Sequence, residues 1–312
     1  AASTQAAQAG FDQQFLKQLE YLHVVAKKVF AGKSRAERRS RGQGSGIEFA
    51  DHRDYTAGDD LRYLDWSVYG RMDRLLLRLF EQEEDLHIYL LIDRSASMRL
   101  GGKPDVPLLR RGTDGRMAKL GYAAQITAAL AYVGLANLDR VSIVSTADKV
   151  MDRMPTTRGK ARIFKVFRFL KELEPAGITD LNDALKAFVA QNKRRGLAVL
   201  ISDLYDPEGF EKGINVLRYN KFDPFVIHVI DRNEGRPKLN GDVLLYDCET
   251  GEDREVTVTP GVLRKYAEVY DEYLASVDRF CVGRQVPHIQ ADVSTDFDEL
   301  ILRVFRRGGS LR

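Results

Sequence analysis

Residues 88–98 read IYLLIDRSASM, an apolar run that stops at Asp93 and is followed by two hydroxyls at alternate positions, Ser95 and Ser97. A short continuous apolar run is typical of a strand that is buried on both faces. The polar residues after it fit three interpretations: a nucleophile, a metal site or a simple polar turn.

Further apolar runs alternate with helical patterns along the chain. Strands are predicted at residues 139–147, 197–203, 223–231 and 288–293, and helices at residues 117–137, 161–173, 180–195 and 261–281. Buried strands that alternate with helices form a mostly parallel sheet covered on both faces. The sequence therefore predicts a doubly wound α/β fold, which binds ligands at the carboxyl ends of its strands.

The first 87 residues lack this alternation, and we assign them to an extension of a domain at residues 88–312. Residues 1–10 are expected to be a flexible leader, and residues 33–41 an exposed basic loop. Between them lies one apolar stripe at helical spacing, which predicts a helix with a buried face. The stripe consists of Phe11, Phe15, Leu19, Leu22, Val25 and Val29.

Composition narrows the class of protein. Hydrophobic residues make up 44% of the 312 residues, which suits a globular protein, and the net charge of +3 is too small to imply a polyanionic partner. Cys248 and Cys281 form no CxxC pair, which favours a reducing compartment. The apolar runs are too short to span a bilayer, so we expect a cytoplasmic location.

Five oxygen-bearing side chains are expected to converge at one edge of the predicted sheet. Two are acids at the ends of predicted strands, and the others lie in loops beside them. A set of oxygen donors without His or Cys favours a hard cation such as Mg²⁺, with Mn²⁺ or Ca²⁺ as substitutes in vitro. The candidate metal site comprises Asp93, Ser95, Ser97, Thr179 and Asp203.

Two other interpretations of these residues are less favoured. Ser and Asp are common in turns and at helix N-termini, so each motif taken alone is weak. Ser95 and Ser97 lie outside a G-x-S-x-G motif, and His228, within an apolar strand, is expected to be a core residue. Asp93 as a phosphoryl acceptor would need a second acid at the position of Ser95. We therefore expect a protein that is not an enzyme, with a metal-dependent hydrolase as the lesser alternative.

The three motifs, DRSAS at 93–97, TD at 179–180 and SD at 202–203, resemble the metal-ion-dependent adhesion site of von Willebrand factor type A domains. The resemblance implies that Ser95, Ser97 and Thr179 contact Mg²⁺ directly. It implies that Asp93 and Asp203 act mainly through water, and that a partner donates a further acidic ligand.

From about residue 12 to residue 309 the chain is also similar to the bacterial family called "domain of unknown function 58". The most specific segment is YTAGDDLRYLDW at 55–66, and GITDLNDAL at 177–185 and YDCETGEDREV at 246–256 extend the match. This resemblance implies a partner or adaptor of MoxR-type AAA+ ATPases in a chaperone-like system. Residues 99–116 form an insertion, relative to the family, beside the candidate site.

The segment at 55–66 carries no chemistry that we can assign. Its expected role is structural, with Trp66 buried and Asp59, Asp60 and Asp65 paired with nearby arginines such as Arg53 and Arg62. Binding of a partner by this segment is the lesser alternative. A second class of function, binding of RNA or other nucleic acid by the basic residues 33–41, stays open as an alternative.

Overall fold

The computed structural model describes residues 11, 13–30, 39–42, 48–83, 86–100 and 117–308. They form two compact units, a larger one made of Ala1–Ala26 and Leu86–Arg312 and a smaller one made of Lys27–Asp85. The predicted leader at 1–10 lies outside the described residues, as do residues 101–116 of the insertion and 33–38 of the basic loop.

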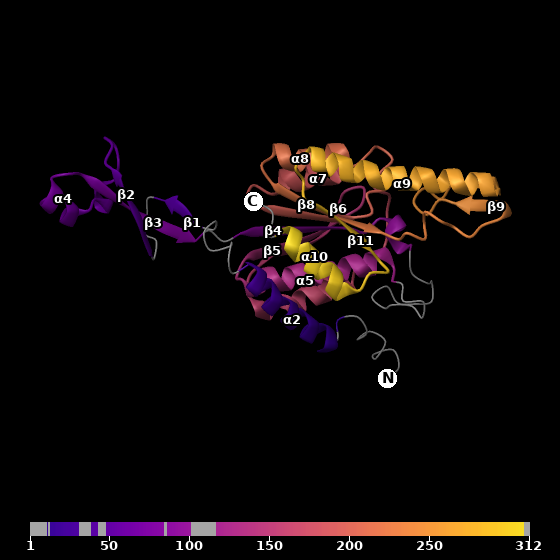
Figure 1. The fold of residues 1–312 in the computed structure, drawn as a ribbon, viewed down its shortest axis with the longest axis horizontal. Helices are drawn as coiled ribbons and strands as arrows, with labels where there is room; N and C mark the ends of the chain where they lie inside the picture. The colour runs from indigo at the N-terminus through magenta and orange to yellow at the C-terminus, as the bar shows by residue number, and fades with distance from the viewer. Residues whose placement is uncertain are drawn as a thin grey trace. The chain divides into compact units, whose positions relative to one another are not determined.

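A six-stranded sheet forms the centre of the larger unit (Figure 1). Its strands lie in the order β11-β8-β7-β4-β5-β6, and all neighbours are parallel except the antiparallel pair β5 and β6. The prediction of a mixed α/β fold with a mostly parallel sheet is confirmed. The strands are β4 (His87–Asp93), β5 (Arg140–Thr146), β6 (Val150–Thr157), β7 (Leu197–Ser202), β8 (Asp223–Ile230) and β11 (His288–Asp292).

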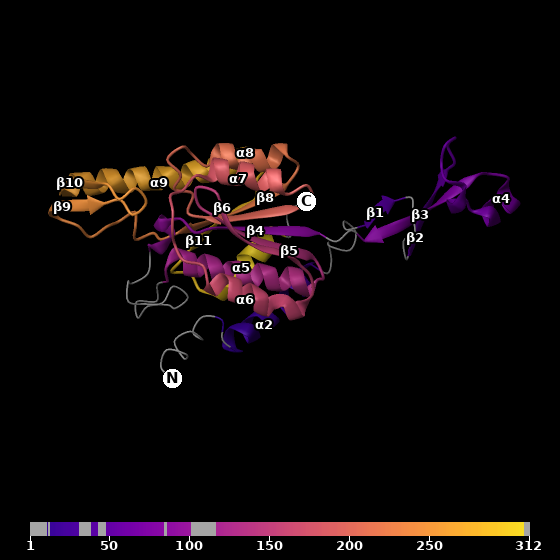
Figure 2. The ribbon, with the colours of Figure 1, turned by 180° about the vertical axis from the view of Figure 1, so that it is seen from behind.

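Helices cover both faces of this sheet (Figures 1 and 2). On one face lie α7 (Leu181–Gln191), α8 (Glu211–Tyr219) and α9 (Pro260–Gly283), and on the other lie α5 (Lys119–Ala136), α6 (Ile163–Lys171) and α10 (Phe297–Gly308). The sequence also predicts a helix at residues 207–220 with Pro207 in its first turn, but α8 begins at Glu211, so this placement of Pro207 is wrong. Among the described residues, no helix has both the length and the apolar character needed to cross a membrane.

Small residues let α5 approach the sheet closely. Most of its residues are buried, and a Cβ on Gly134 would lie 2.9 Å from side-chain atoms of Ile88 on β4 and Val141 on β5. The Ala-rich composition of this helix therefore reflects a tight contact with two central strands, and this contact places the first residue of α5, Lys119, beside the ends of the strands.

Aromatic side chains pack on the opposite face of the sheet, between its strands and the helices α7, α8 and α9. The rings of Tyr89 on β4, Phe188 on α7 and Phe222 lie 5.2–5.7 Å apart, within a core cluster that also includes residues of β7, α8 and α9. Rings at such separations contribute beyond their burial alone. This packing fixes β4 and β7 side by side, and the candidate acids lie at the carboxyl ends of these two strands.

The N-terminal helix α2 (Gln13–Phe30) lies in the larger unit up to Ala26, and its last residues fall in the smaller unit. Phe11 stacks on Phe167 of α6 at 4.7 Å, and Phe15 packs on Phe297 of α10 at 5.3 Å. Four residues of the predicted apolar stripe, Phe11, Phe15, Leu19 and Leu22, are buried, and the side chains of Val25 and Val29 lie outside the described ones. The ring partners of Phe11 and Phe15 come from α6 and α10, distant in sequence, which periodicity does not reveal.

The smaller unit contains an antiparallel sheet in the order β1-β3-β2, formed by Arg39–Gly42, Leu76–Glu83 and Glu48–Asp54. Residues 39–41 are therefore part of strand β1 and not of the loop that their basic composition suggested. The backbone pairing with β3 stabilises a strand whose side chains alone give no apolar signal.

The family-specific segment at 55–66 leads into the short helix α4 (Trp66–Met72), which begins at its last residue. The expected pairs of Asp59 with Arg53 (2.8 Å) and Asp60 with Arg62 (2.6 Å) are confirmed. Trp66, however, is 61% exposed, so its predicted burial is wrong. None of the residues of α4 is buried, and Trp66 makes an edge contact with Tyr69 on the same helix.

Asp65 organises this segment. Its carboxylate accepts hydrogen bonds from the backbone N–H groups of Ser67 and Val68 and so caps α4, and it pairs with His52 and Arg78 where a pairing with Arg53 or Arg62 was expected. The hydrogen bond with His52 and those from Val68 and Arg78 outweigh desolvation and lower the pKa of Asp65 to about 2. Asp65 is therefore ionised at neutral pH.

Candidate functional site

The candidate site lies where the order of strands in the sheet reverses. From β4 the chain continues to β5 and β6 on one side, and from β7 it continues to β8 and β11 on the other. Loops that leave adjacent parallel strands in opposite directions open a crevice at their carboxyl ends. Asp93 is the last residue of β4, and Asp203 directly follows the last residue of β7, so the predicted acids meet at this point.

Asp93 is completely buried, and each of its carboxylate oxygens accepts a hydrogen bond. Its Oδ1 accepts a hydrogen bond from the N–H of Ser95 (2.9 Å), and its Oδ2 accepts one from the hydroxyl of Ser202 (2.5 Å). Burial and the nearby carboxylate of Asp203 nevertheless raise the pKa of Asp93 to about 7. Two acids this deeply buried favour the presence of positive charge beside them.

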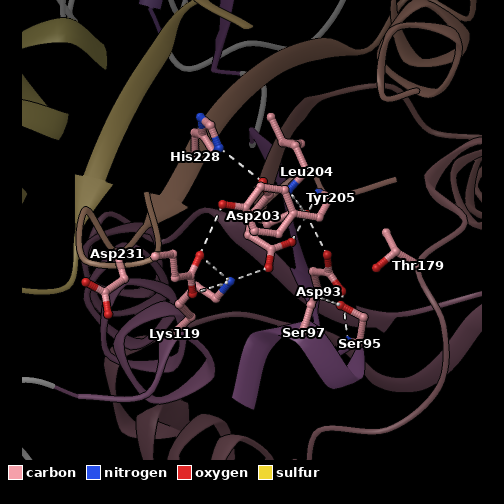
Figure 3. Close-up of polar contacts among 12 residues, drawn as sticks. Asp93, Ser95, Ser97, Lys119, Thr179, Asp203, Leu204, Tyr205, His228 and Asp231 are labelled. Atoms are coloured by element: carbon pink, nitrogen blue, oxygen red, sulfur yellow. Dashed lines mark hydrogen bonds and ion pairs between the residues drawn. The ribbon is translucent and has the colours of Figure 1, made fainter. Parts of the chain in front are cut away.

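The two serines of the opening stretch point toward each other. Both are buried, and the turn of Ala96–Arg99 brings their hydroxyl oxygens to 3.0 Å (Figure 3). A backbone hydrogen bond from Ala96 to the carbonyl of Gly177 ties this turn to the loop that carries Thr179. The predicted Ser95, Ser97 and Thr179 thus lie on two loops that are joined through their backbones.

Thr179 is buried in the loop between α6 and α7, and it meets a residue that the sequence did not indicate. Its N–H and hydroxyl donate to the two carboxylate oxygens of Glu249, at 2.9 Å and 2.8 Å. The N–H of Ser97 approaches the same carboxylate at 3.4 Å. Glu249 comes from the turn between β9 (Gly241–Tyr246) and β10 (Asp253–Val258), where nothing distinguishes it from the other acids in the sequence.

Asp203 is paired with a second unexpected residue, Lys119 at the start of α5 (Figure 3). The ammonium lies 2.7 Å from Asp203 and 3.0 Å from Glu234, and Tyr205 donates its hydroxyl to Glu234. Lys119 is 0% exposed; burial alone would lower its pKa, but the carboxylates of Asp203 and Glu234 outweigh burial and raise it. The sequence held one signal for this pairing, a single lysine at the first position of a largely apolar helix.

His228 plays the part predicted for it, that of a buried core residue. Its Nε2 is hydrogen-bonded with the backbone carbonyl of Asp203 at 3.0 Å, not with either serine. Burial, with a contribution from His288, lowers the pKa of His228 to about 3, so the ring is neutral at physiological pH. It is therefore placed to support the backbone under Asp203 and not to activate Ser95 or Ser97.

The donor set fits a hard cation. In the part of the chain that the structure describes, no three His, Cys, Asp or Glu side chains group as metal ligands, so a metal here would rely on hydroxyls. The 3.0 Å between the hydroxyls of Ser95 and Ser97 equals the separation of about 3.0 Å between adjacent ligands of an octahedral ion with bonds of about 2.1 Å. Neutral hydroxyls beside two buried carboxylates suit Mg²⁺ better than a softer metal.

Comparison with known proteins finds one family and several uncharacterised relatives. A family model described as "Protein of unknown function DUF58" matches residues 51–273. Uncharacterised proteins of Mycobacterium bovis and Mycobacterium tuberculosis are 26% identical over 305 residues, which cover 96% of this chain and 92% of each relative.

Among solved structures, the conserved hypothetical protein BatB from Bacteroides thetaiotaomicron aligns with a TM-score of 0.43 and 12% identity, over 72% of this chain and 98% of that one. An aerotolerance-related membrane protein from Bacteroides fragilis aligns with a TM-score of 0.40 and 16% identity, over 71% and 99%.

Proposed function

The chain belongs to the DUF58 family, as its motifs predicted, and because the description of that family assigns no function we propose one from the site. We propose that the protein is a Mg²⁺-dependent protein–protein interaction module and not an enzyme. The observation that carries this proposal is the pair of buried hydroxyls, Ser95 and Ser97, held 3.0 Å apart beside the buried carboxylate of Asp93.

In this proposal the larger unit is a von Willebrand A-like domain, and the roles of its site residues follow from their contacts. Ser95, Ser97 and Thr179 would hold the ion through their hydroxyls. Asp93 and Asp203 suit an outer role, because their oxygens already accept hydrogen bonds from Ser202 and Lys119. Bound Mg²⁺ would supply a positive charge with an open coordination position, which attracts a carboxylate.

In this proposal the site does not catalyse the cleavage of a bond. The hydroxyls of Ser95 and Ser97 are hydrogen-bonded to each other, and the neutral ring of His228 is engaged with a backbone carbonyl. A serine nucleophile needs a base within hydrogen-bond reach of its own hydroxyl. The arrangement therefore supports binding better than hydrolysis.

Calorimetric titration tests the metal site. The wild-type protein is expected to bind Mg²⁺, whereas Asp93→Asn and Ser95→Ala are each expected to weaken binding at least about tenfold, the size of effect typical of residues that support a metal. The matched control is Asp183→Asn, which alters an exposed acid on α7. Equal Mg²⁺ affinity in the wild type and both site variants would disprove the proposed site.

The partner class comes from the family resemblance: we propose a MoxR-type AAA+ ATPase, or a client of one, that donates an acidic residue. In a pull-down read by mass spectrometry, the ATPase is expected with the wild-type protein in Mg²⁺ and not in EDTA. Ser95→Ala is expected to lose it in both conditions. Recovery of the same ATPase in EDTA would show that the interaction does not use the metal.

A further inference from the structure

In the part of the larger unit that the structure describes, one side chain, that of Glu249, makes the polar link between the hairpin of β9 and β10 and the rest of the unit. It is a separate two-stranded sheet, apart from the central one (Figure 1). Among the described residues, every hydrogen bond that joins Gly241–Val258 to the remainder of the unit is accepted by the carboxylate of Glu249. An isolated two-stranded hairpin is only marginally stable in water, so these hydrogen bonds hold the hairpin in place. We call them the latch.

Hydrogen bonds within the turn that carries Glu249 fix the backbone from which this side chain extends. The carboxylate of Asp247 accepts hydrogen bonds from the N–H groups of Glu249 (2.8 Å) and Thr250 (3.0 Å), and these bonds lower the pKa of Asp247. Gly251 has a φ of 77°, a conformation that favours glycine. The Glu249 side chain therefore starts from a fixed backbone, so little conformational entropy opposes its contact with the site.

The carboxylate of Glu249 lies against two of the residues proposed to hold the metal. One oxygen is 2.8 Å from the hydroxyl oxygen of Thr179 and 3.4 Å from the nitrogen of Ser97, and the other is 2.9 Å from the nitrogen of Thr179. Adjacent oxygen ligands of Mg²⁺ are about 2.8–3.0 Å apart. A carboxylate at this place beside Thr179 is where a partner's acid would be expected.

We propose that Glu249 is an internal acidic ligand of this site and that the hairpin turn excludes a partner's carboxylate until it moves away. The inference rests on the proposed function, because it names how the same site is regulated. A ligand on the same chain has a high effective concentration. A partner that binds here must therefore displace the hairpin.

The only cysteines of the chain, Cys248 and Cys281, allow a direct test, because Cys248 is exposed in the turn and Cys281 is buried. A nitroxide attached to the native Cys248 reports the mobility of the turn by electron paramagnetic resonance. In EDTA, Glu249→Gln is expected to make the label mobile, whereas the wild type holds it. The matched control is Glu252→Gln, which removes an acid from the same turn without touching the site. Equal mobility in all three proteins would overturn the latch.

Adding Mg²⁺ separates a metal ligand from a structural hydrogen bond. Mg²⁺ is expected to restrict the label further in the wild type and to leave Glu249→Gln unchanged. By calorimetry, Glu249→Ala is expected to weaken Mg²⁺ binding at least about tenfold. Unchanged Mg²⁺ affinity in Glu249→Ala would overturn the internal ligand, while a loss in Asp93→Asn would still support the metal site.

Acetate tests whether an external acid fits the same position. In Glu249→Ala, acetate at constant ionic strength is expected to restore Mg²⁺ affinity, with chloride as the control. Failure of acetate to restore it would overturn the exchange with a partner's carboxylate. If the wild-type protein binds no Mg²⁺, the proposed function fails. The label mobility measured in EDTA then still tests whether Glu249 holds the hairpin in place.

Discussion

Replacing Lys119 with Met is expected to destabilise the larger unit by about 3–5 kcal/mol, the effect of leaving buried carboxylates without their cation. The ammonium is fully buried and lies within 3.0 Å of both Asp203 and Glu234. Methionine keeps much of the length and packing of the side chain, so the loss reports the charge. Urea unfolding at neutral pH measures it.

The deficit of Lys119→Met is expected to shrink as the pH falls. Burial raises the pKa of Glu234, and Lys119 counteracts that increase. Without the lysine, Glu234 in the folded protein takes up a proton more readily than in the unfolded chain. A carboxyl with a raised pKa penalises the folded state at neutral pH, and this penalty disappears below the unfolded pKa of about 4.3. Urea unfolding of Lys119→Met and the wild type at pH 7 and pH 5 tests whether the stability deficit is smaller at the lower pH.

Lys265→Met on α9 is the control for this prediction. That lysine is exposed and pairs with Glu268 across one helical turn, so its loss is expected to change stability by less than about 0.5 kcal/mol. If the two methionine variants unfold at the same urea concentration, the buried network around Lys119 does not stabilise the fold.

Phe15→Ala is expected to destabilise the larger unit by about 3–5 kcal/mol, the range for a buried Phe. The ring is buried and contacts Phe11 on the same segment, Phe167 of α6 and Phe297 of α10. Truncation leaves a cavity among three aromatic side chains, two of which, Phe167 and Phe297, come from distant parts of the sequence. Urea unfolding gives the loss, and hydrogen exchange of residues 13–30 shows whether α2 detaches first.

Tyr21→Ala serves as the matched control, because Tyr21 lies on the same helix and is 64% exposed. Its loss is expected to change stability by about 0.5 kcal/mol or less. If Phe15→Ala is as mild as Tyr21→Ala, then α2 is not an integral part of the larger unit, and the division of the chain at residue 87 would be the better description.

The central layers could be predicted because their pattern is local. The apolar residues 88–92 form β4 and the Ala-rich residues 119–136 form α5, as expected for elements buried on most sides. The sheet of the smaller unit was missed because β1 and β2 are charged and gain their stability from backbone pairing with β3. The exposure of Trp66 was missed because hydrophobicity predicts burial only when another surface is available to cover the side chain.

The sequence by itself determined which residue types stand at the ends of β4 and β7, because a strand ends where its apolar run ends. It thereby placed Asp93 and Asp203 at one sheet edge, with Ser95 and Ser97 in the following turn. Only the tertiary structure decided that Lys119 pairs with Asp203, 84 positions away, and that Glu249 meets Thr179 across 70. These contacts depend on how a helix and a hairpin pack against the sheet, and no local spacing records that packing.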